Sequence, residues 1–204
     1  MTMSTTLAGL LLAACCLDAS AQLGNGGTTY SSVEKTADSA ESLIGKFEQA
    51  TRDALTADAS LLGAVGLAAE AEQASAGLKL LAPDATPSMF ESMVKLNSES
   101  CAALAQRLRA QPALDDAGRA RFGGGVVGLA QAVQAYSSLT QDLPGLKQGL
   151  RTAGGAKSRV ALYIAKTLPG SLGEMKQTLK GALDYARQNN IALPAEVGAL
   201  SATL

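Results

Sequence analysis

Apolar side chains recur every three or four positions over most of this chain, and this spacing restricts the fold more than any other sequence feature. Between residues 33 and 54 the repeating positions carry Val, Ala, Leu, Ile and Phe, which form one continuous stripe if the stretch is helical. Aromatic residues make up only 3% of the chain, although 47% of it is hydrophobic. Strands favour aromatic and β-branched residues, whereas a core rich in Ala and Leu suits closely packed helices. The sequence therefore predicts an all-α fold, an antiparallel helical bundle of five to six helices.

Proline, glycine and capping residues divide the periodic region into separate expected helices. Their expected ranges are 30–57, 58–81, 88–110, 112–140, 143–166 and 171–188. The residues expected to cap them are Asp58, Asp142 and the capping-box pairs Ser88–Glu91 and Ser171–Glu174. A kink is expected at 154–155, where two glycines are adjacent.

Glycine is unusually frequent between residues 118 and 128. An interior glycine costs a helix roughly 0.5–1 kcal/mol relative to alanine, so this cluster needs a structural reason. Gly118, Gly125 and Ala132 are seven residues apart and lie near one line along a helix, where they would let a neighbouring backbone approach closely. The run Phe-Gly-Gly-Gly at 122–125 lacks the pattern of a phosphate-binding loop, and no strand precedes it. Two alternatives stay open: the triplet 123–125 lies within one helix, or it divides the helix in two.

The N-terminal segment predicts the compartment in which the chain works. Residues 7–17 form an unbroken apolar run, shorter than the roughly 20 residues of a membrane-spanning helix and followed by small residues. This order is typical of a secretory signal peptide. Leu12-Ala13-Ala14-Cys15 resembles the lipobox of bacterial lipoprotein signals, which implies that Cys15 is lipidated and becomes the new N-terminus. A second cleavage site, Ala19-Ser20-Ala21 before Gln22, would instead release a free protein.

The expected organisation of the chain follows from these signals. It comprises a signal peptide at 1–21, a flexible tether at 22–29, a helical bundle domain at 30–190 and a C-terminal tail at 191–204. Lipidation of Cys15 would hold the protein on the periplasmic side of a bacterial envelope membrane, whereas cleavage before Gln22 would give a periplasmic or secreted protein. Residues 1–6 contain no Lys or Arg, although signal peptides normally begin with positive charge. The alternative is an apolar N-terminal helix that stays with the domain.

Basic residues are concentrated in the C-terminal half of the chain. Residues 1–102 contain 5 basic and 12 acidic side chains, whereas residues 103–204 contain 12 basic and 6 acidic ones. The candidates for binding anionic lipid headgroups or acidic polymers are Lys147, Arg151, Lys157, Arg159, Lys166, Lys176, Lys180 and Arg187. The alternative is that the two halves pair their charged side chains within one bundle. Tyr163 and Tyr185 are too few to stack on bases, so no nucleic-acid partner is expected.

The residue types present exclude most catalytic chemistry. The chain has no histidine, so a Ser-His-Asp triad, an H-E-x-x-H zinc site and a histidine general base cannot form. Cys101 is the one cysteine expected outside the signal peptide, and its place on the apolar stripe of the third helix predicts a buried, inert thiol. We expect no catalytic residue, no metal and no cofactor.

These features together predict an exported, non-enzymatic protein held in the cell envelope by a membrane anchor at Cys15. Its expected role is structural, or the binding of another envelope protein. The alternative is a binding module that takes an apolar ligand in the bundle interior, or an anionic lipid or polymer on the basic C-terminal helices.

Overall fold

The computed structural model describes residues 27–80, 86–153 and 155–200, and all of its regular elements are helices. The elements are α1 (Gly27–Ala64), α2 (Ala68–Gly77), a short 3₁₀ turn η1 (Leu78–Leu80), α3 (Pro87–Arg109), α4 (Asp116–Ala153), α5 (Gly155–Gln188) and α6 (Ala195–Leu200). No strand occurs in these three ranges, and the predicted all-α bundle is confirmed. The expected signal peptide, including Cys15, lies outside the described residues.

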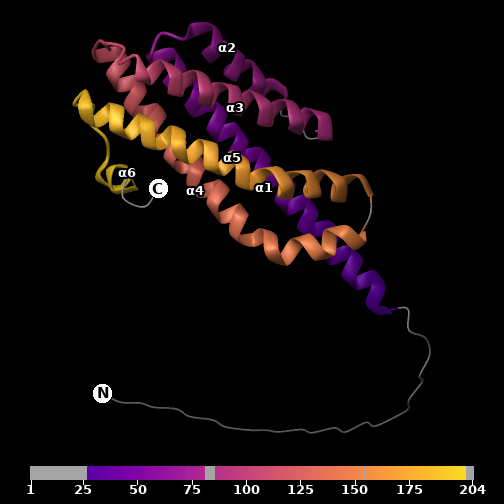
Figure 1. The fold of residues 1–204 in the computed structure, drawn as a ribbon. Coiled ribbons are helices and arrows are strands. Elements are labelled where there is room, and N and C mark those ends of the chain that lie inside the picture. Colours follow the sequence, from indigo (N-terminus) through magenta and orange to yellow (C-terminus); the bar gives the residue numbers. More distant parts are fainter. Residues whose placement is uncertain (1–26, 81–85, 154, 201–204) are drawn as a thin grey trace, which may run out of the picture.

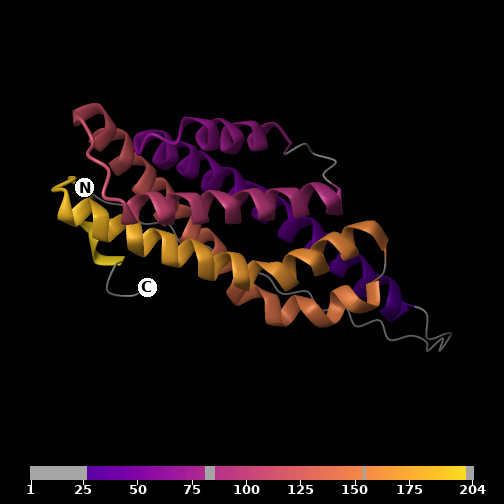
Figure 2. The ribbon, with the colours of Figure 1, turned by 45° about the horizontal axis from the view of Figure 1, so that its top comes forward.

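From α1 to α5, successive helices run in opposite directions along the length of the bundle (Figure 1). α1 packs most extensively against α4, and α5 packs against both α3 and α4. Thr51 of α1 and Tyr136 of α4 mark where these two helices meet in the core, because their hydroxyl oxygens are 2.8 Å apart. α2 folds back over α1 and α3 on one side of the bundle (Figure 2), so α1 contacts all of α2, α3, α4 and α5.

The first correction to the sequence prediction concerns Asp58, which does not cap a second helix. α1 continues through it to Ala64, because the stripe of buried residues continues on both sides, at Ala54, Leu61 and Leu62. The helix ends where Gly66 adopts a φ of +83°, in the left-handed region that favours glycine. The backbone N–H groups of residues 66 and 67 then donate to the carbonyls of residues 63 and 62, the pattern of a Schellman motif.

The second correction concerns the start of α3. The expected capping box Ser88–Glu91 lies inside the helix, and Thr86 is the N-cap, with its Oγ1 accepting from the backbone N–H of Met89 at 3.4 Å. Pro87 explains the shift, because a proline lacks the N–H that would be unsatisfied at the first helical position and already has a helical φ.

The third correction concerns α4 and α5, which replace three expected helices. α4 begins at Asp116 instead of 112, with the Asp115 carboxylate accepting from the N–H of Gly118 at 2.7 Å. The glycine triplet 123–125 does not divide it. Pro144 and Pro169 lie within continuous helices, so Asp142 and the Ser171–Glu174 pair cap nothing. The boundary between α4 and α5 falls at the expected glycine pair, where Gly155 has a φ of +86°.

These helices continue through proline because their buried stripes continue. Leu143 and Leu150 are buried on either side of Pro144, and Leu168 and Ser171 on either side of Pro169. Both prolines are exposed, so the backbone carbonyls that lose a helical partner can reach water.

Glycine allows α1 and α4 to pack closely, as the seven-residue spacing predicts. A Cβ atom added to Gly125 would lie 2.7 Å from Cγ of Leu61, and one added to Gly128 would lie 3.2 Å from Cβ of Ala57. Ala132, one further step along the same line, is fully buried. The close contact requires glycine at position 125, since real Cβ atoms do not approach other atoms within 3 Å.

The core consists mainly of leucine and alanine, and the few aromatic residues fill its largest gaps. Phe47 packs against Phe90 and Tyr136, and at the other end Phe122 packs against Tyr185 with ring centroids 5.0 Å apart. Within the described part of the chain, none of the helices has both the length and the apolar character needed to cross a membrane.

Candidate functional site

A groove of about 490 Å³ lies between α3 and α5. Cys101, Leu108, Thr178 and Tyr185 form its floor. The groove exists because the upper positions of both helices carry small side chains, at Ala102, Ala105 and Gly181. A Cβ atom added to Gly181 would meet nothing within 4 Å, so this side of α5 faces open space.

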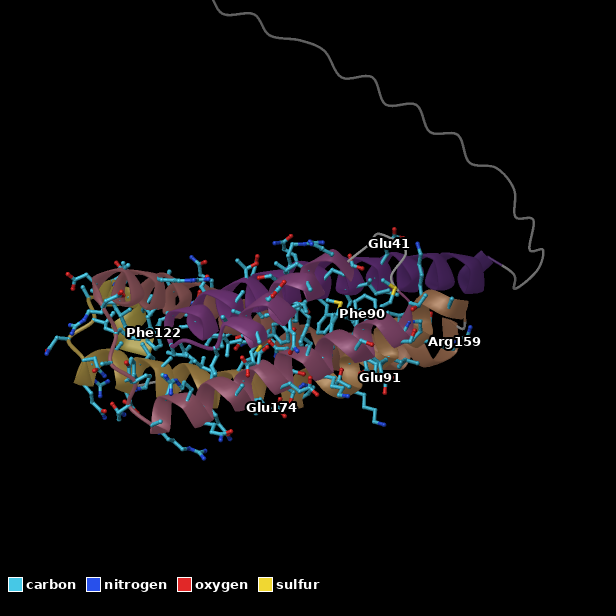
Figure 3. All side chains as sticks on the ribbon, turned by 90° about the horizontal axis from the view of Figure 1, so that it is seen from above. Glu41, Phe90, Glu91, Phe122, Arg159 and Glu174 are labelled. Carbon is cyan, nitrogen blue, oxygen red and sulfur yellow. The ribbon has the colours of Figure 1, made fainter. Side chains whose placement is uncertain are left out.

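Polar groups surround this floor. They are Ser98, Arg109 and Gln111 from α3 and the turn that follows it, and Glu174, Gln177, Asp184 and Gln188 from α5. Figure 3 shows Glu174 at the outer edge of the bundle, where α3 and α5 lie side by side. The rim of the groove therefore carries three glutamine amides, two carboxylates and one guanidinium, and its floor is largely apolar.

Some charged side chains of the groove already form an ion pair with another residue of the chain, and others do not. Asp184 forms an ion pair with Arg187, with 3.3 Å between Oδ1 and Nη1. In the described residues no ion pair or hydrogen bond joins the Glu174 carboxylate or the Arg109 guanidinium to another side chain. The groove consequently presents one unpaired acid near its Ser98 end and one unpaired base near its Gln111 end.

The thiol of Cys101 is buried and free, as the sequence predicts. Burial, together with the negative charges of Asp58 and Glu174, raises its pKa to about 12, although a hydrogen bond with Thr178 partly opposes this shift. The thiol is therefore protonated at neutral pH and unsuited to thiolate chemistry.

Asp58 is the functional candidate that the sequence analysis missed. Its side chain is fully buried, and neither carboxylate oxygen has a hydrogen-bond partner. Burial raises the pKa of this carboxyl to about 8. The sequence spacing indicates this burial. Asp58 lies seven residues after Thr51 and four after Ala54, so it falls on the buried stripe of α1.

Other polar groups occupy the same interior. The hydroxyls of Thr51 and Tyr136 bond to each other, and Thr51 donates to the carbonyl of Phe47 at 2.7 Å. The side-chain oxygen of Asn97, on α3, is buried without a partner. Among the described residues no group of three or more Cys, Asp or Glu side chains is placed to hold a metal ion.

The eight basic residues expected to form an anionic-surface site divide between two helices. Lys147 and Arg151 belong to α4, and their side chains lie outside the described part. The other six lie on α5: Lys157, Arg159, Lys166, Lys176, Lys180 and Arg187. Arg159, Lys166 and Lys180 are exposed and lie near one line, spaced by about 10 and 20 Å along the helix. Binding of anions by these residues stays a prediction.

Part of the charge asymmetry is balanced inside the molecule. Lys157 of α5 pairs with Glu41 of α1 at 2.7 Å, and Lys46 of α1 approaches Asp142 of α4 at 3.9 Å. The first pair joins an acid of the N-terminal half to a base of the C-terminal half, whereas the second joins a base of the N-terminal half to an acid of the C-terminal half. Figure 3 shows Glu41 and Arg159 at the same end of the bundle. Of these two ion pairs, Lys157–Glu41 has the polarity that pairing between the acidic and the basic half requires.

The fold and the groove define an all-α helical bundle with a polar groove along one side. No protein-family model, curated protein or solved structure matches the chain significantly, so these features carry the functional argument.

Proposed function

We propose that this chain is an exported, non-catalytic interaction protein, tethered to the cell envelope through Cys15, that binds a partner in the groove between α3 and α5. The groove is the single observation that carries the proposal. It has a volume of about 490 Å³, which lies in the usual range of binding sites, and its rim provides hydrogen-bonding amides above a largely apolar floor.

The choice of an interaction role over an enzymatic one rests on the available side chains. The chain has no histidine, and the Cys101 thiol in the groove floor is held in its unreactive protonated form. The carboxylates of the groove have no metal ligand set around them in the described residues. Binding needs none of these groups.

Photo-crosslinking of the full chain in its native envelope tests the proposal. A photoreactive amino acid replaces Gln177 in the groove, and in a matched control it replaces Gln134, an exposed glutamine on α4 that takes no part in the groove. We expect a discrete crosslinked polypeptide with the first variant and none with the second. Equal crosslinking at both positions, or none at Gln177, would show that the groove is not a binding surface.

A further inference from the structure

We propose that the α3–α5 groove binds an extended segment of another polypeptide and places a lysine or arginine side chain of that segment beside Glu174. This inference rests on the proposed function and adds the chemical class of the partner.

The dimensions of the groove suit an extended peptide. Its lining runs from Ser98 to Gln111 on one side and from Glu174 to Gln188 on the other. These stretches of 14 and 15 residues, nearly all of them helical, correspond to about 20 Å at the helical rise per residue. At about 3.3 Å per residue, an extended chain of roughly six residues spans that length.

The hydrogen-bonding groups also match a peptide backbone. Gln111, Gln177 and Gln188 each carry both a donor and an acceptor in one side-chain amide. An extended backbone presents alternating N–H and C=O groups, and each needs a partner when it leaves water. The small residues Ala102 and Ala105, at the upper positions of α3, leave room for short side chains of the segment.

Charge determines which segment fits. Asp184 is already paired with Arg187, whereas no ion pair to the Glu174 carboxylate forms within the described residues. A basic side chain of the ligand would therefore meet an unneutralised acid at the Ser98 end of the groove, and an acidic side chain of the ligand would meet the unpaired Arg109 near the Gln111 end; the inference concerns the first of these contacts. A contact of this kind, exposed at the rim, contributes mainly to specificity.

The chain's own N-terminal segment is a poor occupant by the same criterion. Residues 1–26 contain one aspartate and no lysine or arginine, so they lack the side chain that Glu174 would pair with. A segment of a different polypeptide is the better complement.

Peptide selection on the purified full chain tests the ligand class. The probe is a displayed library of random hexapeptides, and we expect the selected sequences to be enriched in lysine and arginine. For a selected peptide, Glu174→Gln should raise the Kd about two- to fivefold, as expected for an exposed ion pair. The matched control Glu72→Gln, an exposed acid on α2 outside the groove, should leave the Kd unchanged. Selection without basic enrichment, or equal effects of the two substitutions, would overturn the inference.

A second pair of variants locates the binding. Gly181→Leu fills the groove, whereas Gly173→Leu places the same side chain on α5 outside it; a Cβ at either position meets nothing within 4 Å, so both variants should fold. We expect at least a tenfold loss of peptide affinity for the first variant only. Peptide binding that survives Gly181→Leu refutes the peptide assignment. If crosslinking at Gln177 persists while no peptide is selected, the partner-binding function stands and the extended basic segment is wrong.

Discussion

Asp58 is held in an environment that favours its neutral form. The titratable groups that face it are Cys101 from α3 and Tyr136 from α4, and both are themselves buried and uncharged at neutral pH. With no basic side chain to compensate an ionised carboxylate, burial alone sets its pKa near 8. The folded protein therefore binds a proton here that the unfolded chain, with a carboxyl pKa of 3.8, has already released at neutral pH.

This difference gives the stability of the fold a definite pH dependence. The contribution of Asp58 is fully present below about pH 4 and is lost as the pH rises toward about 8, by about 1.4 kcal/mol per pH unit. Asp58→Asn should flatten the free energy of unfolding between pH 5 and 8, measured by urea denaturation at several pH values. The asparagine amide also changes the free energy of unfolding by an amount that does not depend on pH. The quantity to compare is therefore the slope of the free energy of unfolding against pH.

Asp53→Asn is the matched control for that experiment, because Asp53 is exposed on the same helix. It should keep the wild-type slope. If the free energy of unfolding has the same slope against pH in wild type and Asp58→Asn, the buried carboxyl does not titrate between pH 5 and 8.

At the scale of the elements, the contact between α1 and α4 depends on the absence of a single side chain. Gly125→Ala adds a Cβ 2.7 Å from Cγ of Leu61 and 3.2 Å from the backbone N of the same residue. We expect a loss of about 1–3 kcal/mol in the free energy of unfolding, although alanine is the better helix former.

The neighbouring Gly124 isolates the packing effect. It is exposed, and a Cβ there meets nothing within 4 Å, so Gly124→Ala should gain about 0.5–1 kcal/mol from helix propensity. Thermal and urea denaturation of both variants check the pair. Equal stabilisation by the two substitutions would mean that α1 and α4 can separate without loss.

The helical stripes could be predicted from sequence, and so could the C-terminal ends of α3 and α5, whereas the breaks expected at Asp58, Pro144 and Pro169 do not occur. The stripe that contains Phe90 and Leu104 specifies α3 by its spacing alone. At Pro144 and Pro169 the local signal for termination competes with buried residues on both sides, and burial is stronger. A proline removes one helical hydrogen bond at a cost of about 3 kcal/mol, and burying one or two leucines is enough to offset it.

The groove could not be predicted for a different reason. Each of its walls is an ordinary helix face with small and polar residues. It becomes a site only because α3 and α5, far apart in the chain, pack side by side. Asp58 was within reach of sequence reasoning, but an aspartate after an apparent helix end has the usual appearance of a cap.

For the whole molecule, the proposed tether makes a prediction about processing. If Cys15 is lipidated, the mature protein should begin at this residue and fractionate with membranes, and Cys15→Ser should abolish both properties. Intact mass of the purified mature form is the measurement. A form that begins at Gln22 would indicate an untethered exported protein, and a form that retains residues 1–21 would exclude export by this signal.

The central position of α1 also has a consequence for the time course of synthesis. α1 is the first helix to be made, yet its most extensive contact is with α4, which ends at Ala153. At about 5–20 residues per second, the ribosome needs roughly 5–20 s between the end of α1 and the end of α4. During this interval the apolar side of α1 lacks its main partner, and the nascent chain depends on α2, α3 or a chaperone to keep that side from aggregating.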